Sequence, residues 1–164
     1  MGFLANLLGY IPPEQPPVLV SFFPSAAADM ILHGKLLTIQ TDKLILASGE
    51  VCHFVDIAAA ITEKQRRQSI HAGSSYRIGK GFTMHSGRSE SVPVSEPTYT
   101  KGVLYITNQR IVFTASKNGF DKRLKALTAV TPYSNGVALQ YGSKTYTLLS
   151  PNGEIIKRTL DLLL

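Results

Sequence analysis

Residues 102–120 read GVLYITNQRIVFTASKNGF, and the rhythm of this stretch predicts the fold. Aliphatic, β-branched and aromatic residues run up to Thr107, resume after Asn108-Gln109, and stop before Asn118-Gly119. Such residues favour β-strands, in which successive side chains point to opposite faces, and Asn-Gly is a strong signal for a tight turn between strands. The stretch therefore predicts a β-hairpin with a second turn that leads into a further strand.

A two-residue turn at Asn108-Gln109 would fix the register of this hairpin. It places residue 106 opposite 111 and residue 104 opposite 113. One face then carries Leu104, Ile106, Ile111 and Phe113. The other face carries Val103, Tyr105, Val112 and Thr114. Because both faces bear apolar groups, we expect a central hairpin that is partly covered on both sides, with Arg110 binding a nearby carbonyl or carboxylate.

The rest of the C-terminal half continues the pattern and then changes period. TAVTPY, VALQY and KTYTLL are separated by turn signals at the short, even spacing of an all-β barrel or sandwich. In the last fifteen residues Pro151 suits a helix start, and Ile156, Leu160 and Leu163 recur at helical spacing. We expect an amphipathic C-terminal helix that covers an apolar opening of the sheet.

The first 48 residues carry weaker signals. IPPEQPP, residues 11–17, should be a stiff polyproline-like spacer. Ser25 as N-cap and Gly34 as terminator predict a short helix over 26–32. LLTIQ and LILA predict a hairpin around residues 41–43. The expected organisation is an N-terminal apolar turn and spacer over 1–24, a helix plus hairpin over 25–48, and a barrel with its C-terminal helix over 49–164.

The apolar start, MGFLANLLGY, has two interpretations. We expect its apolar turn to dock on the protein's own body or on a second copy of the chain, which would give a homo-oligomer. A membrane foot is the weaker alternative, because no basic residue occurs before Lys35 to accompany it. Asn at position 6 does not fit the myristoylation pattern, and no stretch has the apolar length of a transmembrane helix.

Composition narrows the function classes. Hydrophobic residues make up 44% of the 164, too many for a disordered chain, and charged residues make up 17%. The single cysteine, Cys52, excludes an internal disulfide framework and indicates a reducing, cytoplasmic location. The net charge of +6 favours anionic partners such as lipid head groups, nucleic acid or an acidic protein.

Most of the excess charge lies in one region. Residues 62–101 hold seven basic and three acidic residues, a net charge of +4, and they are poor in aliphatic side chains. The composition predicts a loop-rich, exposed region, and its basic residues are either a binding site or only a solvated surface. The candidate partner-binding residues are Arg66, Arg67, Tyr76, Arg77, Lys80 and Arg88.

No catalytic, metal or cofactor site can be assembled from the sequence. GSSYRIGKG fails the phosphate-loop pattern, because five residues separate Gly73 from Gly79 and Gly81 follows Lys80 where Ser or Thr is needed. The four histidines share no metal spacing. Cys52 and His53 are adjacent on an expected strand and so point to opposite faces, which predicts a buried thiol and a separate imidazole.

One motif resembles a known family. G102-x-L104-x-I106-T107-N108-x-R110-I111-x-F113 is similar to the G-x-L-x-I-T-N-x-R-I-x-F signature of the GRAM and bacterial pleckstrin-homology-like (PH-like) families, and the resemblance extends over residues 49–164. It implies a mainly β protein, a PH-like β-barrel or sandwich of about seven antiparallel strands capped by a C-terminal α-helix. It also implies a binding module, because the family has no shared active site.

The resemblance leaves the partner open. Members of the family bind lipids, proteins or peptides, and the head-group pattern K-x-n-[KR]-x-R is not cleanly present here. We therefore expect a protein partner first, with an anionic lipid or nucleic acid as alternatives. Similar stand-alone bacterial proteins occur in phage or mobile-element settings, where blocking a host target would be a natural use.

Overall fold

The computed structural model of the chain describes residues 13–77 and 83–164, and within these the side chains outside 68–90. It divides into two compact units. Residues 15–62 and 98–164 form the first, which we call the body. The second contains residues 63–97, whose two strand segments, 63–77 and 83–97, we call the arm.

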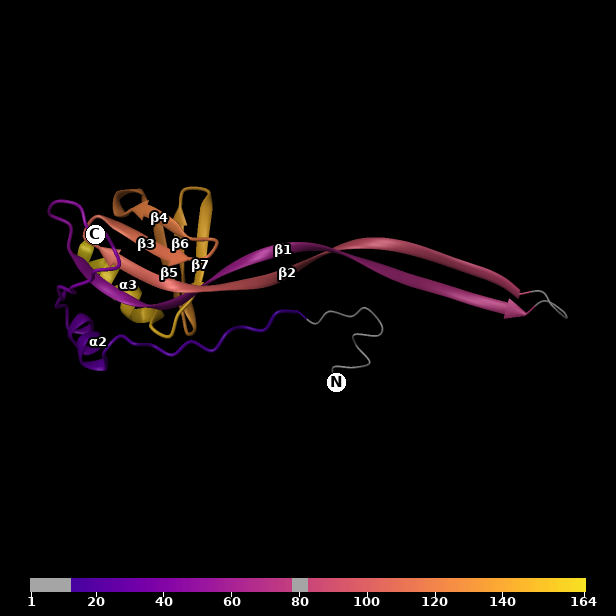
Figure 1. Cartoon of the computed structure of the whole chain (residues 1–164), viewed down its shortest axis with the longest axis horizontal. Coiled ribbons are helices and arrows are strands. Elements are labelled where there is room, and N and C mark those ends of the chain that lie inside the picture. Colours follow the sequence, from indigo (N-terminus) through magenta and orange to yellow (C-terminus); the bar gives the residue numbers. More distant parts are fainter. Residues whose placement is uncertain (1–12, 78–82) are drawn as a thin grey trace. The chain divides into compact units, whose positions relative to one another are not determined.

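The protein is mainly β, with a seven-stranded antiparallel sheet and a C-terminal helix (Figure 1). The strands are β1 (Cys52–Arg77), β2 (Thr83–Thr107), β3 (Arg110–Ala115), β4 (Phe120–Arg123), β5 (Ala129–Tyr133), β6 (Gly136–Tyr141) and β7 (Lys144–Leu149). The helices are α2 (Ser25–Leu32), a 3₁₀ turn (Leu124–Ala126) and α3 (Gly153–Leu163). The hydrogen-bonded order is β4-β3-β2-β1-β7-β6-β5. The seven strands and the C-terminal helix agree with the sequence prediction.

The β2–β3 hairpin has the predicted register. Ile106 lies opposite Ile111 and Leu104 opposite Phe113. All four side chains are buried in the main core. Tyr105 and Val112, on the other face, form a smaller buried cluster with Cys52. The hairpin is therefore covered on both faces, as the two-sided apolar pattern predicts.

Helix α3 covers the main core. Ile156 and Leu160 are fully buried in that core, and Leu163 packs against it from a partly buried position. The helix contacts β5, β6 and α2. Its first residue, Gly153, lies so close to β6 that a Cβ there would meet the Gly136 carbonyl oxygen at 2.3 Å. The predicted amphipathic helix is confirmed, and its start needs a residue without a side chain.

The sheet is curved but not closed. β4 and β5 are its two edges in the hydrogen-bonded order. Phe120 of β4 nevertheless packs on Tyr146 of β7, with 4.4 Å between ring centroids, although three strands separate them in the sheet. The curvature thus brings side chains of distant strands together around one core without a continuous ring of hydrogen bonds.

The predicted hairpin over residues 36–47 is wrong. The only strand-like pairing there is a single bridge between Ile39 and Cys52. Leu44 instead packs on the smaller buried cluster, and the Leu37 carbonyl contacts Nδ1 of His53 at 2.6 Å. Ile39 packs on the main core and Ile45 is exposed, so the apolar residues of this segment neither share one face nor pair with each other.

The N-terminal region contains the predicted short helix and spacer. Helix α2 begins one residue early, at Ser25, with Pro24 as N-cap and no side-chain cap. Gly34, at φ +86°, terminates it as predicted, because the Lys35 amide donates to the Met30 carbonyl and the Gly34 amide to the Ile31 carbonyl. Residues 13–17, the described part of the predicted spacer, form no helix or paired strand, and the predicted apolar turn lies outside the described residues.

Candidate functional site

The basic region predicted from the sequence is a pair of strands. β1 continues to Arg77 and β2 begins at Thr83, so the loop-rich prediction for residues 62–101 is wrong. The strands are neighbours in the sheet order and lie side by side in Figure 1. Fifteen residues of each strand belong to the arm, a length of about 50 Å at 3.3 Å per residue. The arm is poor in apolar residues, and none of its described side chains belongs to either buried cluster.

The structure describes some of the candidate partner-binding residues in full, some by their backbone only, and one not at all. Arg66 forms an ion pair with Glu96 across the arm at 3.4 Å. Lys64 and Arg67 are exposed, and neither has an ion pair within the described residues. Tyr76 and Arg77 lie at the end of β1 and Arg88 lies in β2, with side chains outside the described set, and Lys80 falls outside the described residues. The structure thus brings most of the predicted residues onto one two-stranded element.

The base of the arm has polar contacts between its strands. Ser95 donates a hydrogen bond to the Glu63 carboxylate at 2.9 Å. Just inside the body, the hydroxyls of Thr62 and Thr98 lie 2.7 Å apart. These hydrogen bonds and the ion pair of Arg66 join the side chains of β1 and β2. None of the described side chains here belongs to a buried apolar cluster.

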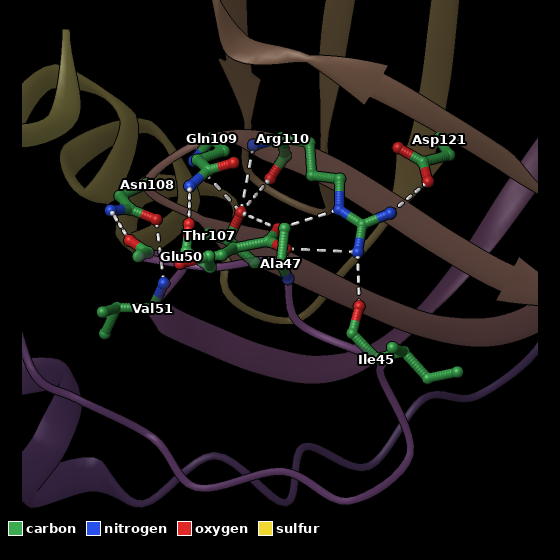
Figure 2. A network of polar contacts seen from close by, with 11 residues as sticks. Ile45, Ala47, Glu50, Val51, Thr107, Asn108, Gln109, Arg110 and Asp121 are labelled. Atoms are coloured by element: carbon green, nitrogen blue, oxygen red, sulfur yellow. Dashed lines mark hydrogen bonds and ion pairs between the residues drawn. The ribbon is translucent and has the colours of Figure 1, made fainter.

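A second cluster of polar side chains lies in the body, around the turn between β2 and β3 (Figure 2). Glu50, with a fully buried side chain, accepts a hydrogen bond from the Thr107 hydroxyl at 2.7 Å and from the Ala47 amide at 2.7 Å. It also accepts a hydrogen bond from Nε–H of Arg110 at 2.8 Å. The hydroxyl oxygen of Thr107 in turn accepts hydrogen bonds from the backbone amides of Gln109 and Arg110, and these bonds fix the turn.

Arg110 uses its guanidinium to join three parts of the chain. Besides Glu50, it donates from Nη1 to Asp121 of β4 at 2.5 Å and from Nη2 to the Ile45 carbonyl at 2.7 Å (Figure 2). Asn108 extends the same connection, since its side chain accepts the Val51 amide and donates to the Gly49 carbonyl. The expectation that Arg110 binds a carbonyl and a carboxylate is confirmed.

The electrostatics of this cluster indicate a structural role. Burial raises the pKa of Glu50, but the hydrogen bonds from Arg110, Ala47 and Thr107 outweigh it and hold the pKa below its usual value. The hydrogen bond to Glu50 raises the pKa of Arg110 above its ordinary value. An ionised carboxylate whose oxygens already accept several hydrogen bonds is a poor general base, so the cluster suits holding the hairpin in place.

A cleft of about 780 Å³ lies beside the cluster. Arg110 and Asp121 line it, together with the exposed basic residues Arg123 and Lys125. Ile45, also in the lining, is 90% exposed. Sequence reasoning did not find this cleft, because its residues come from three segments and no local pattern joins them.

Another buried carboxylate that sequence reasoning missed is Asp56. It is 1% exposed and accepts hydrogen bonds from the Ser21 hydroxyl, the Phe22 amide and the Asn152 side-chain amide at 2.7, 3.0 and 2.7 Å. These contacts attach the N-terminal segment to the sheet and to the residue before α3. All these groups around Asp56 are hydrogen-bond donors, so the buried side-chain oxygens have partners within the fold and a structural role accounts for them.

The remaining reactive side chains are also in structural positions. Cys52 is fully buried and its burial raises the pKa of the thiol, while the His53 ring contacts the Leu37 carbonyl. The prediction of a buried thiol and a separate imidazole is confirmed. Among the described residues, no group of three His, Cys, Asp or Glu side chains could hold a metal ion. No helix in that part of the chain has the length and apolar character to cross a membrane.

The chain was compared with family models, with curated proteins and with solved structures. No family model matches it, no curated protein matches it, and no solved structure matches it.

Proposed function

We propose that this protein is a non-enzymatic, cytoplasmic binding module of the PH/GRAM-like type, and that its arm engages an anionic region of a protein partner. The observation that carries the proposal is the arm itself. It belongs to a compact unit separate from the body, its described side chains contribute nothing to the buried clusters, and it contains five of the chain's seventeen basic residues. A two-stranded element with few apolar residues gains stability when it binds a surface.

The PH/GRAM-like part of the proposal rests on the signature residues. Thr107 and Arg110 belong to the cluster that holds the β2–β3 turn, and Leu104, Ile106, Ile111 and Phe113 fill the core. Gly102 lies where a Cβ would meet the Thr114 carbonyl oxygen at 2.3 Å. Each of these signature positions therefore has a structural reason, as expected if the motif marks a fold and not an active site.

A second candidate function is binding of nucleic acid. It is favoured by one observation, because a basic two-stranded β-ribbon is a shape that enters the grooves of duplex DNA. Anionic lipid is a third class of partner. Like nucleic acid and an acidic protein it is negatively charged, so it would also bind through exposed basic groups of the arm.

The test uses two matched variants of the full chain. Lys64→Gln/Arg66→Gln/Arg67→Gln removes three positive charges from the arm, and Lys122→Gln/Arg123→Gln/Lys125→Gln removes three from exposed positions on the body. Binding to poly-glutamate, to phosphatidylserine vesicles and to duplex DNA is measured for both. We expect the arm variant to lose affinity for at least one probe by about tenfold or more, and the body variant to retain it. Equal behaviour of the two variants with every probe would contradict the proposal.

A further inference from the structure

The strands of the arm leave two backbone edges open. In the body, β1 pairs with β7 at residues 59–61 and β2 pairs with β3 at residues 102–106. Within the described residues of the arm, no third strand lies beside either β1 or β2. Each strand therefore presents a row of backbone N–H and C=O groups that can accept another strand.

The two edges are not equivalent in their capacity for pairing. β2 carries Pro93 and Pro97 within the arm, whereas β1 has no proline along its whole length. Proline has no N–H, and in a strand it is tolerated where that missing donor faces away from the neighbouring strand. Pro93 and Pro97 thus remove donors from the outer edge of β2, a common way of blocking an edge, and the edge of β1 lacks this protection.

The two edges also differ in charge. The arm segment of β1 contains Lys64, Arg66, Arg67 and Arg77 against a single acid, Glu63, which gives a net charge of +3. The arm segment of β2 contains Arg88 against Glu90 and Glu96, which gives a net charge of −1. The edge without proline is the basic one, and its positive charges disfavour pairing with any strand that is not acidic.

We propose that the open edge of β1 in the arm binds an extended, acidic segment of a protein partner as a third strand. The inference rests on the proposed function and names its partner class. Added main-chain hydrogen bonds would supply affinity, and the exposed Lys64 and Arg67 would select acidic side chains. A nucleic acid would instead place phosphates along both strands, and the net negative charge of β2 opposes that arrangement.

The experiment measures binding of a labelled peptide to the full-length protein by fluorescence anisotropy. The probe is a peptide of about ten residues that alternates Glu and Val, which is long enough to pair along most of one strand. A Lys-Val peptide tests the charge. The Glu-Val peptide with its backbone amides N-methylated keeps the charge but cannot donate hydrogen bonds to an edge.

Hydrogen exchange then locates the bound peptide. We expect saturating Glu-Val peptide to slow amide exchange in residues 63–77 by about tenfold and to leave residues 83–97 unchanged. The N-methylated and Lys-Val peptides should bind at least about tenfold more weakly. The Lys64→Gln/Arg66→Gln/Arg67→Gln variant should lose affinity by a similar factor, and the Lys122→Gln/Arg123→Gln/Lys125→Gln variant should not.

Several outcomes overturn the inference. The inference is wrong if the Glu-Val peptide does not bind at concentrations up to about 1 mM, or if the N-methylated peptide binds equally well. It is also wrong if the bound peptide slows amide exchange in β2. If the arm variant loses binding only to duplex DNA or only to vesicles, strand addition is wrong while the arm remains the binding element. If the arm variant matches wild type with every probe, the proposed function itself fails.

Discussion

The body and the arm share β1 and β2, yet the strands are stabilised differently in each. In the body, β2 residues such as Leu104 and Ile106 are fully buried, and a buried Glu50–Arg110 pair holds the turn that ends the strand. In the arm, the described contacts between side chains are an ion pair of Arg66 and a hydrogen bond of Ser95. The same two strands thus provide a packed core in the body and an open surface in the arm.

This difference implies that mutations in the two regions act on different properties. Changes in the body should alter the free energy of unfolding, because they affect buried groups. Changes in the arm should alter binding, because its described side chains are largely exposed or engaged in weak surface contacts. The predictions below test that separation, beginning with the largest expected effect.

Replacing Glu50 should cause the largest loss of stability. Glu50→Ala removes the buried acceptor of Arg110, Thr107 and the Ala47 amide, and we expect the free energy of unfolding to fall by about 3 kcal/mol. Urea denaturation measures it. Asp121→Ala is the control, because this half-exposed partner of Arg110 should contribute less than about 1 kcal/mol. Equal losses of unfolding free energy in the two variants would show that the buried Glu50 contributes no more to stability than the half-exposed Asp121.

The same carboxylate should make stability depend on pH. Because its pKa is lowered in the folded protein, ionised Glu50 contributes its full stabilisation above about pH 4.5, the usual value, and this contribution is lost as the pH falls through the lowered pKa. Wild type should therefore lose stability on acidification more steeply than Glu50→Gln. Urea titrations between pH 6 and 3 test this, and parallel curves would contradict it.

A methyl group at Gly102 should destabilise the hairpin. The added Cβ would lie 2.3 Å from the Thr114 carbonyl oxygen and 2.8 Å from the Phe113 ring, so the strands must shift to relieve the clash. We expect Gly102→Ala to lower the free energy of unfolding by about 2 kcal/mol. Lys101→Ala, a change at the exposed neighbouring position, should stay within about 0.5 kcal/mol of wild type.

The hairpin shows why part of the fold could be predicted from the sequence. A side-chain period of two and a two-residue turn together specify the register, so the pattern alone is enough to pair Ile106 with Ile111. Helix α3 was predictable for the same reason, since its apolar residues recur at a helical period over three turns. Both features are encoded within about fifteen neighbouring residues.

Other features depend on contacts that no local pattern encodes. Glu50 lies 60 residues from Arg110 in the sequence, so no local sequence pattern predicts that the two side chains form a pair. Residues 36–47 contain two short apolar runs around a polar turn, but this pattern cannot distinguish two strands that pair from a segment that packs on the sheet through single residues such as Leu44. The strands of the arm lack the apolar alternation that indicates a half-buried strand, so their composition predicts loops instead.

Removing the hydroxyl of Tyr141 should stabilise the body slightly. This hydroxyl is buried and, among the described residues, has no hydrogen-bond partner. We expect Tyr141→Phe to raise the free energy of unfolding by about 1 kcal/mol at neutral pH. Burial raises the pKa of Tyr141 to about 12, so wild type should also lose stability as the pH rises from about 10 to 12, and the variant should lose less. A destabilised variant would indicate that the hydroxyl is hydrogen-bonded after all.

Neutralising the arm should have the smallest effect on stability and the clearest effect on binding. Lys64→Gln/Arg66→Gln/Arg67→Gln removes one ion pair in which both side chains are partly exposed, and two exposed charges without an ion pair in the described structure. Surface pairs contribute about 0–1 kcal/mol, so the urea midpoint should change little. Affinity for an anionic probe should nevertheless fall by about tenfold, because the body stays folded while the arm loses charge. A large loss of stability would mean that the arm supports the body, and the two regions would then have to be treated as one.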